Sequence, residues 1–589
     1  SELKLFHFRT LGEALRSATG FVAGNDPAFD QFIIRGIGIP YDYNTRVLIL
    51  INGHPLNEWI GNSALDVGEK FLIPLEAVKQ IEITRGPGSV IYGTSAFLGV
   101  INVQTKDDYN GFTADIQYGS FNEKEYGLTF GKQFSRETRI LFSASHHETD
   151  GDTLFFDQYE EDPTEGYFDL AQAKSSHYFL NMKWKEFSLT GAWGDFYNVL
   201  GGGLASSVFY SDKNVQKEVR SYLELKYEMM HTEQQHLTLK TFYDHYDYRD
   251  EFDYRPDPFW YDVLVSNSYG GECLLNYTGW EKNAITTGVE IIHAETKMKN
   301  GEISFPHYVL IEKDFNLFRY FLKDEFSFNE RLLIITGAQY NHHELFDQGW
   351  VLRGAFIFKQ SDATTFKGVY SQGFRSPTIY EALYEDDQTY HSNPDLKRED
   401  VDTIELVMEK KIFNNQGEFS ASLYHNRFEN MISDASWEDP LLGLIETNIN
   451  SGSFSTQGAE LTFKWRFLSG QELVVNGAWQ DDCGNDLINF PQWLANLNVA
   501  VPFGSQWTFS AIINYVGQRY TRDLDTELDP YTNVDAGILS KTLFNHLDLW
   551  IGVKNIFDEE IQTALGGGFF SLKGPFRGRS YCMKLSARF

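Results

Sequence analysis

The amino-acid sequence predicts a membrane β-barrel of about 22 antiparallel strands, with its lumen occupied by an N-terminal α+β domain. Three observations predict this fold: the composition, a two-residue hydrophobic period, and alternating short and long connections. Aromatic residues make up 16% of the 589 residues, yet the mean hydropathy is only −0.36. No stretch reaches the roughly 18 consecutive apolar residues that a spanning helix needs, which excludes helical membrane proteins. This composition is typical of strands that face lipid on one side and a wet lumen on the other.

The two-residue period is clearest in residues 460–467. Leu461, Phe463, Trp465 and Phe467 share one face of the expected strand, and polar or charged residues occupy the other. The same alternation recurs in residues 221–229 and 581–589. It extends over too much of the chain for one soluble sandwich, and its aromatic face fits a membrane interface.

The connections and the chain length set the expected number of strands. Short polar connections such as residues 329–330 alternate with long ones such as residues 152–168, which is typical of an outer-membrane barrel. At roughly 22 residues per strand with its share of the connections, residues 107–589 would form about 22 strands. A barrel of this width needs a plug. We assign that role to residues 1–106.

Residues 1–106 have the pattern of a small α+β domain. Short apolar runs at 46–51 and 81–84 predict strands, and Asn52-Gly53 predicts a turn. Thr10 is the expected N-cap of a helix over residues 10–17, with Glu13 at capping-box spacing. A second short helix is expected from Pro74 over residues 75–78.

Charge, cysteines and motifs exclude several classes of protein. The formal net charge of −32 argues against nucleic acid as a partner. The three cysteines, Cys273, Cys483 and Cys582, are far apart, which argues against a disulfide framework or a zinc site. No hydrolase elbow, phosphate-binding loop or zinc-hydrolase helix is present, so no enzyme is predicted. The chain begins at Ser1 without an apolar signal segment, so either a targeting segment was removed or the sequence starts inside the mature protein.

Several segments in order along the chain resemble the TonB-dependent outer-membrane receptors. The plug segments are residues 10–15, 32–38, 46–53, 81–93 and 99–106, of which 81–93 is the most specific. In the barrel, the similar segments are residues 374–377 with 393–396, residues 555–558, and the terminal Phe589. The resemblance covers almost the whole chain, and it implies an integral protein of the Gram-negative outer membrane.

The resemblance also implies a function and partners. Such a receptor binds a scarce ligand from outside and imports it with energy transmitted by TonB and its inner-membrane energising complex. The expected ligand is a ferric siderophore or another metal chelate, and haem or cobalamin stays open as an alternative. A TonB-independent structural or passive-channel barrel is the alternative from another class. Nothing before Leu3 resembles a TonB box, so we expect that box upstream of Ser1.

Further partners follow from the same resemblance. Outer-membrane lipid and lipopolysaccharide would surround the barrel. A surface lipoprotein is a further candidate partner that the sequence leaves open.

The expected ligand site lies on the outward apex of the plug. Aromatic side chains there can pack on a bulky chelate while polar groups orient it. For each candidate, packing between plug and barrel is the alternative role. His391 lies between the two similar barrel segments, residues 374–377 and 393–396, and would contribute only if the ligand is haem. A solvated loop histidine is the alternative. The plug candidates are Tyr41, Asp42, Tyr43, Asn57, Glu58, Trp59 and Asn62.

Charged residues suggest two further features. Arg35 and Arg85 on plug strands need carboxylate partners inside the lumen, and Glu460 on the inner face of the wall is the expected one. Acidic loops at 160–162, 385–387 and 523–529 are candidates for Ca²⁺, although they lack EF-hand spacing and a solvated charge run is favoured. No cofactor is firmly implied, and no residue is assigned as a metal ligand.

Overall fold

The computed structural model of the chain describes most of the 589 residues and allows the barrel and the plug to be traced separately. The described residues are 2–25, 29–38, 42–64, 66–156, 166–169, 171–201, 204, 207–254, 260–302, 308–385, 390–439, 443–484, 487–566 and 572–589. Within them, no helix is both long enough and apolar enough to cross a membrane.

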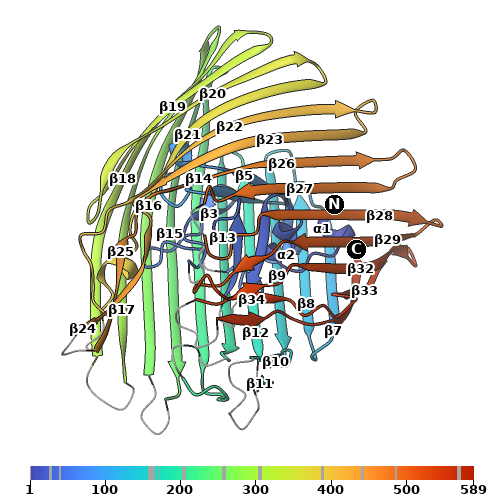
Figure 1. Cartoon of the computed structure of the whole chain (residues 1–589). Helices are drawn as coiled ribbons and strands as arrows, with labels where there is room; N and C mark the ends of the chain where they lie inside the picture. Colours follow the sequence, from blue (N-terminus) through green and yellow to red (C-terminus); the bar gives the residue numbers. More distant parts are fainter. Residues whose placement is uncertain are drawn as a thin grey trace.

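The predicted barrel is confirmed: 22 antiparallel strands close into one sheet (Figure 1). Tight turns on one rim alternate with longer connections on the other, and we call these the turn rim and the loop rim. The barrel strands are β7 (Gly111–Gly119), β8 (Lys124–Gln133), β9 (Thr138–Thr149), β12 (Ala173–Trp184), β13 (Phe187–Val199), β14 (Val215–Thr232), β15 (Gln235–Phe252), β16 (Trp260–Trp280), β17 (Asn283–Glu302), β18 (Tyr308–Asn329), β19 (Leu332–His343), β20 (Gln348–Ser361), β21 (Thr364–Arg375), β22 (Glu399–Ile412), β23 (Gly417–Glu429), β26 (Phe454–Arg466), β27 (Glu472–Asp481), β28 (Trp493–Phe503), β29 (Trp507–Val516), β32 (Tyr531–Leu543), β33 (Leu547–Lys554) and β36 (Ser580–Arg588).

The loop rim carries short elements of its own. They are β10 (Leu154–Phe155), β11 (Tyr167–Phe168), α4 (Ile379–Leu383), β24 (Ile432–Asp439), β25 (Gly443–Asn450), β30 (Arg519–Tyr520), β31 (Glu527–Leu528), β34 (Gln562–Ala564) and β35 (Lys573–Pro575). Helix α4 begins with a complete capping box between Thr378 and Glu381.

The first and last strands close the barrel. Strand β36 pairs with β7 from Cys582 opposite Gly119 to Arg588 opposite Thr113. Phe589 extends this ladder, because its N–H and C=O both bond to Phe112 at 2.9 Å. Closure leaves the sheet with no unpaired edge.

The two faces of β26 follow the predicted alternation. Leu461 is 52% exposed on the outer surface, whereas the neighbouring Glu460 is 2% exposed and points into the lumen. Trp465 lies one residue before the end of the strand, where its ring stacks on Phe413 and Phe467 at centroid distances of 4.4 and 3.9 Å. Trp465 therefore belongs to an aromatic girdle at the turn rim, and Leu461 is the residue nearer the middle of the membrane.

A charge at Leu461 tests this face assignment. Leu461→Arg places a guanidinium in hydrocarbon and is expected to destabilise the barrel by about 2–4 kcal/mol. Lys464→Ala, on the lumen side of the same strand, should change stability by less than about 0.5 kcal/mol. Urea unfolding in lipid vesicles, followed by heat-modifiable mobility, measures both; a larger loss from Lys464→Ala would reverse the faces.

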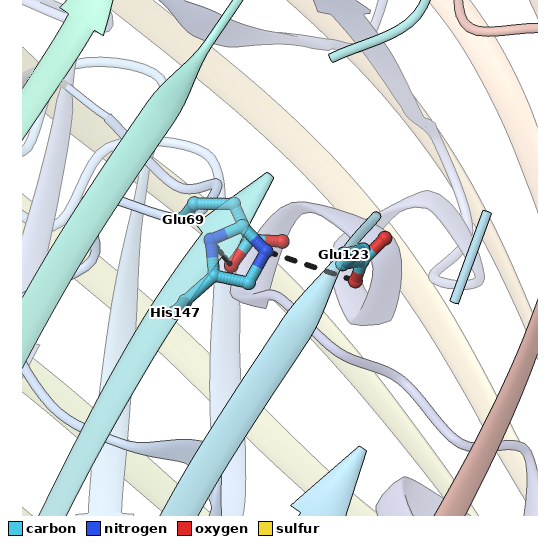
Figure 2. A group of neighbouring side chains, drawn as sticks. All are labelled: Glu69, Glu123 and His147. Carbon is cyan, nitrogen blue, oxygen red and sulfur yellow. Dashed lines mark ion pairs between the residues drawn. The ribbon is translucent and has the colours of Figure 1, made fainter. Parts of the chain in front are cut away.

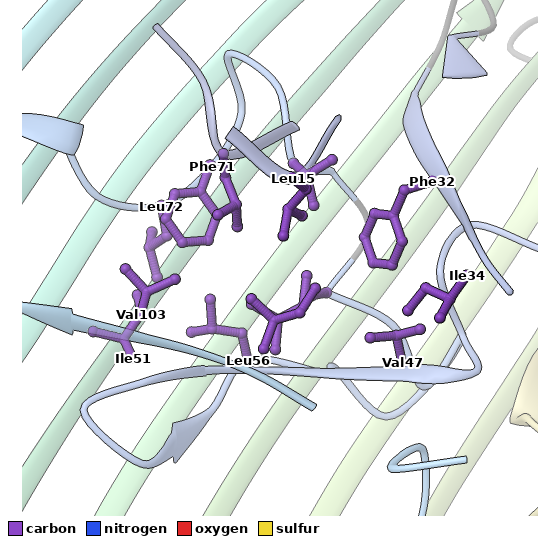
Figure 3. Close-up of a cluster of buried hydrophobic side chains, with 14 of the residues drawn as sticks. Leu15, Phe32, Ile34, Val47, Ile51, Leu56, Phe71, Leu72 and Val103 are labelled. Carbon is purple, nitrogen blue, oxygen red and sulfur yellow. The ribbon is translucent and has the colours of Figure 1, made fainter. Parts of the chain in front are cut away.

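The plug lies inside the barrel wall and has its own hydrophobic core (Figures 1 and 3). A four-stranded sheet in the order β4-β3-β6-β5 packs against α2 and the β1–β2 hairpin. Figure 3 shows Leu15, Phe32, Val47 and Val103 converging from these elements. The plug elements are α1 (Glu2–Leu5), α2 (Leu11–Arg16), β1 (Phe21–Asn25), β2 (Asp30–Ile34), β3 (Val47–Ile51), β4 (His54–Pro55), the 3₁₀ helix η1 (Leu75–Ala77), β5 (Val78–Arg85), α3 (Ser89–Tyr92) and β6 (Gly99–Thr105).

The helix starts in the plug differ in detail from the expectation. The Thr10 hydroxyl accepts a hydrogen bond from the Glu13 N–H at 3.2 Å, as an N-cap does. The Glu13 carboxylate, however, accepts from the N–H of Arg9 rather than Thr10, because Arg9 also brings its guanidinium to that carboxylate. The expected helix over residues 75–78 is a single 3₁₀ turn, Leu75–Ala77.

Candidate functional site

The plug loop after β4, residues 56–64, forms one side of the candidate site. The Asn57 side chain fastens it to the plug sheet by donating to the carbonyls of Val47 and Asn62 at 3.2 and 2.9 Å. The Glu58 carboxylate accepts the N–H groups of Ile60 and Gly61, both at 2.6 Å. Side-chain bonds of this kind fix a loop without regular secondary structure.

This loop faces the loop rim. The N–H of Tyr380, in α4, donates to the Ile60 carbonyl at 3.1 Å. Ile60 also packs in a buried cluster with Ile379. The loop is therefore at the outward apex of the plug, as the sequence predicts.

Two cavities separate the apex loop from the barrel wall. The larger has a volume of about 630 Å³ including its open mouth, and Asn57, Trp59 and Asn62 line its plug side. Strands β15, β17 and β18 supply Asp244, Glu290 and Arg319 to its wall side. The smaller cavity, about 310 Å³, lies beside Glu58 and shares Asn57, Trp59 and Asp244 with the larger one. An aromatic ring beside a few convergent polar groups is typical of a small-molecule site.

The larger cavity contains buried polar atoms that are not fully satisfied. Glu290 Oε2 pairs with Arg319 Nη2 at 2.5 Å, and Arg319 Nη1 donates to the Tyr92 carbonyl. In the described part of the chain, Glu290 Oε1 and Arg319 Nε have no hydrogen-bond partner. Buried polar atoms are usually paired, so these two are candidates for contact with a ligand or water.

Beneath the cavities, His54 joins the plug to the wall. Its Nδ1 lies 3.0 Å from Glu224 and its Nε2 lies 2.7 Å from Asp244, while its ring stacks on Tyr222 at 4.1 Å. Burial lowers the pKa of His54, but the two carboxylates outweigh it and raise the pKa to about 9. His54 is therefore a cation at neutral pH. Burial also raises the pKa of Glu58 to about 7, against the opposing effect of its backbone N–H donors.

Comparison with known proteins identifies the architecture. The family model "TonB dependent receptor-like, beta-barrel" matches residues 83–556, and the model "TonB-dependent Receptor Plug Domain" matches residues 1–100. The chain belongs to the TonB-dependent receptor family. It is accordingly an outer-membrane receptor and not an enzyme.

Relatives of this receptor include curated proteins and solved structures. The iron-regulated outer membrane virulence protein of Vibrio cholerae is 23% identical over 96% of this chain and 88% of its own. Vitamin B12 transporter BtuB of Vibrio vulnificus is 24% identical over 100% of this chain and 91% of its own.

Two solved structures share the fold. Copper transporter OprC has a TM-score of 0.80 at 15% identity, covering 99% of this chain and 95% of its own. The siderophore receptor PirA from Acinetobacter baumannii has a TM-score of 0.77 at 16% identity, covering 100% and 97%.

The remaining apex candidates of the receptor have other surroundings. Asp42 pairs with Arg46 at 3.0 Å. The Tyr43 ring packs edge-on against Phe29 at 4.6 Å and lines neither cavity. Tyr41 lies outside the described residues. His391 is exposed on the loop rim, where its N–H donates to the Glu446 carbonyl, and it lines neither cavity.

Arginines of the plug meet carboxylates of the wall at several places, two of which lie around Glu460 and Glu399. At the first, Arg35 and Arg85 both contact Glu460, at 3.1 and 3.3 Å. Arg35 also pairs with Glu405 at 2.6 Å and lies over the Tyr424 ring at 4.1 Å. Charge-assisted contacts of this kind orient the plug in the lumen.

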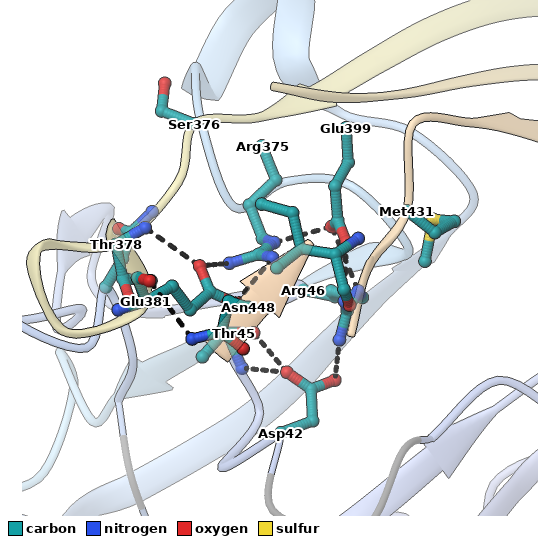
Figure 4. Close-up of polar contacts among 12 residues, drawn as sticks. Asp42, Thr45, Arg46, Arg375, Ser376, Thr378, Glu381, Glu399, Met431 and Asn448 are labelled. Carbon is teal, nitrogen blue, oxygen red and sulfur yellow. Dashed lines mark hydrogen bonds and ion pairs between the residues drawn. The ribbon is translucent and has the colours of Figure 1, made fainter. Parts of the chain in front are cut away.

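The second place is a buried ion network that sequence reasoning missed (Figure 4). Arg46, in the turn just before β3, and Arg375, at the end of β21, both reach Glu399 at the start of β22, each at 2.6 Å. Arg375 also pairs with Glu381 in α4 at 2.8 Å. Arg375 lies in the family-like barrel segment 374–377, so the sequence marked it as a residue of interest. Nothing in the sequence connects it to Arg46. This network, which we call the Glu399 network, links the plug, the wall and α4.

The predicted acidic loops give no further support for Ca²⁺. The Asp523 carboxylate accepts hydrogen bonds from Thr521 and Thr526 within its own turn, at 2.7–2.9 Å. Residues 160–162 and 386–387 lie outside the described part of the chain.

Proposed function

We propose that this receptor imports a ferric siderophore or a similar metal chelate, which binds between the plug apex and the barrel wall. The observation that carries the proposal is the larger cavity, where Trp59 offers an aromatic surface beside Asn57 and Asn62. An aromatic surface packs on the organic shell of a chelate, and the Asn62 amide hydrogen-bonds to its polar edge.

The charge of the cavity favours one class of chelate. Asp244 and Glu290 supply two carboxylates, while Arg319 in the lining and His54 next to Asp244 supply two cations. The cavity therefore offers no net positive charge to hold a strongly anionic ligand. The free acceptor Glu290 Oε1 also suits an N–H or O–H donor on the ligand. We therefore propose a chelate that is neutral or cationic, such as a ferric tris-hydroxamate, over a strongly anionic ferric tris-catecholate.

The relatives support iron as the cargo and leave a second candidate. Two Vibrio cholerae relatives are named iron-regulated outer membrane virulence proteins. Another relative is named a vitamin B12 transporter, which keeps cobalamin as the second candidate. Haem has less support, because His391 is not among the residues that line the two cavities.

Energy from TonB is part of the proposal. A passive channel would gain nothing from a plug tied to its wall by buried ion pairs, such as Arg46 with Glu399. We propose that TonB pulls on a segment at the N-terminal end of the plug and that this pull is transmitted to the plug. A TonB pull-down with the full-length receptor, with and without that segment, tests this step.

Trp59 provides the test of the ligand site. Trp59→Ala removes an aromatic surface worth about 1–3 kcal/mol of contact, so affinity for a ferric tris-hydroxamate should fall at least tenfold. Trp493→Ala is the matched control, because Trp493 is exposed on the outer face of β28. Titration of the detergent-purified receptor with ferric tris-hydroxamate, ferric tris-catecholate and cobalamin measures both the site and the ligand class.

Two outcomes would count against the proposal. Equal affinity of the Trp59→Ala variant and the wild type would move the site off the plug apex. Tight binding of the tris-catecholate or cobalamin, with no binding of the tris-hydroxamate, would reject the ligand class while keeping the site.

A further inference from the structure

A second cluster of metal-ligating side chains lies away from the two cavities (Figure 2). It brings together Glu69 of the plug, Glu123 in the turn before β8, and His147 of β9. One ligand atom from each residue lies within 4.8 Å of the others. His147 is 4% exposed and Glu123 is 2% exposed. Figure 2 shows the ion pairs of the imidazole with the two carboxylates as dashed lines.

The geometry of His147 is unusual for a buried imidazole. Its Nδ1 lies 3.8 Å from Glu69 Oε2, and its Nε2 lies 3.7 Å from Glu123 Oε1. Both separations are too long for hydrogen bonds, and neither ring nitrogen has a hydrogen-bond partner among the residues that the structure describes. A buried polar group left unpaired costs stability, so the arrangement calls for a further group.

A small cation between these atoms would resolve the geometry. Ligand bonds of about 2.1 Å in a tetrahedral site place neighbouring ligand atoms about 3.4 Å apart. One imidazole offers an ion only one of its two nitrogens, because their lone pairs point away from each other. With Nε2 as the ligand, its separation of 3.7 Å from Glu123 Oε1 is close to that value. Glu69 is the third ligand, since one ligand atom of each residue lies within 4.8 Å of the others.

We propose that Glu69, Glu123 and His147 form a binding site for a divalent transition-metal ion of the Zn²⁺ type. An imidazole nitrogen with two carboxylate oxygens suits Zn²⁺, with water as a fourth ligand, better than it suits Ca²⁺ or Mg²⁺, which prefer oxygen alone. The proposal does not depend on the transported ligand, because none of the three residues lines the two cavities.

The surroundings of the cluster are compatible with a divalent ion. Arg9 and Gln117 both donate to the Glu123 carboxylate at 3.1 Å and would orient it as a ligand. The carboxylates of Glu69 and Glu123 bring two negative charges to the ion. Glu123 also pairs with Arg9 at 3.1 Å, and Arg9 in turn pairs with Glu13 at 2.8 Å. Arg577, 3.8 Å from Glu123, is a second competing cation.

Binding of an ion here would tie the plug to the wall. Glu69 belongs to the plug, whereas Glu123, in the turn before β8, and His147, in β9, belong to the barrel. A bound ion stabilises only the state in which all three ligands are together. Zn²⁺ would therefore stabilise the seated plug.

The test is titration of the detergent-purified full chain with ZnCl₂. We expect one Zn²⁺ per chain in the wild type, and at least tenfold weaker binding in both His147→Gln and Glu69→Gln. His146→Gln is the matched control and should bind as the wild type does, because His146 is exposed and contacts Ser176 at 3.0 Å instead. Zn²⁺ should also raise the melting temperature of the wild type and of His146→Gln, but not of His147→Gln.

Three results would overturn the proposal. They are the absence of Zn²⁺ binding by the wild type, equal Zn²⁺ binding by His147→Gln, and equal competition by CaCl₂. Heat-modifiable mobility of each variant verifies that the barrel is folded, so loss of binding is read as loss of the site.

Discussion

Glu399→Gln is expected to destabilise the receptor by about 3–5 kcal/mol, because it leaves two buried guanidinium groups without their shared carboxylate. Arg46 donates to Glu399 at 2.6 and 3.0 Å, and Arg375 donates to it at 2.6 Å. The same carboxylate accepts the N–H of Ile432 at 2.7 Å. A glutamine amide offers one acceptor and turns its NH₂ group against a cation.

Unfolding in urea and protease sensitivity of the plug measure this loss. The matched control is Glu409→Gln in the same strand, β22. Glu409 pairs with Lys367 at 2.6 Å, but the two side chains are 47% and 32% exposed, so the change should cost less than about 1 kcal/mol. Equal effects of the two variants would show that the Glu399 network does not hold the plug.

His54→Leu is expected to destabilise the seated plug by roughly 2–3 kcal/mol at neutral pH. It leaves Glu224 and Asp244 without the cation between them, and the cost is below that of a fully buried pair because the Asp244 side chain is 30% exposed. His54 also predicts a pH dependence. Its pKa is raised in the folded state to about 9, so its stabilisation is complete below the unfolded value of about 6.5 and is lost as the pH rises through about 9.

Stability of the plug between pH 6 and pH 10, followed by hydrogen exchange of β3 and β6, measures this dependence. The wild type should lose protection as the pH rises, after correction for intrinsic exchange, and His54→Leu should start lower and lose less. His293→Leu, an exposed histidine of β17, should follow the wild type. The same slope in His54→Leu as in the wild type would remove His54 as the origin of the pH dependence.

The barrel was predictable from the sequence because its signal is local and repeated. Each strand alternates outward apolar and inward polar residues, as Leu461 and Glu460 do. The length of residues 107–589, at roughly 22 residues per strand, predicts the number of strands. The plug was predictable for similar reasons. Turn residues and a cap at Thr10 mark the short elements of the plug. The loops that link its strands could be placed at its outward apex from the order of those strands.

The contacts between plug and wall were only partly predictable. Arg35, Arg85 and Glu460 could be proposed because a plug arginine in a polar lumen needs a carboxylate. The partners of Arg46 and His54 could not, because 353 and 170 residues separate them from Glu399 and Glu224. Such pairings depend on how far each strand is tilted and shifted around the closed barrel, which no local pattern records.

Some of the predicted apex residues line a cavity and others do not, because their positions also depend on packing that no local pattern records. Asn57, Trp59 and Asn62 line the larger cavity, and Glu58 lines the smaller one. Tyr43 turns towards Phe29 instead, because its neighbours on the loop rim provide an aromatic cluster. Composition marks a loop as a candidate site, but the packing around it decides which side chains face the ligand.

The central claim is that this receptor moves a ferric chelate across the outer membrane with energy from TonB. Uptake of a radiolabelled ferric tris-hydroxamate by cells that produce the full-length receptor, with and without TonB, tests it most directly. We predict binding at the surface in both strains, and accumulation inside the outer membrane only in the strain that has TonB. Equal accumulation in the two strains would contradict energised transport, and it would favour a passive channel.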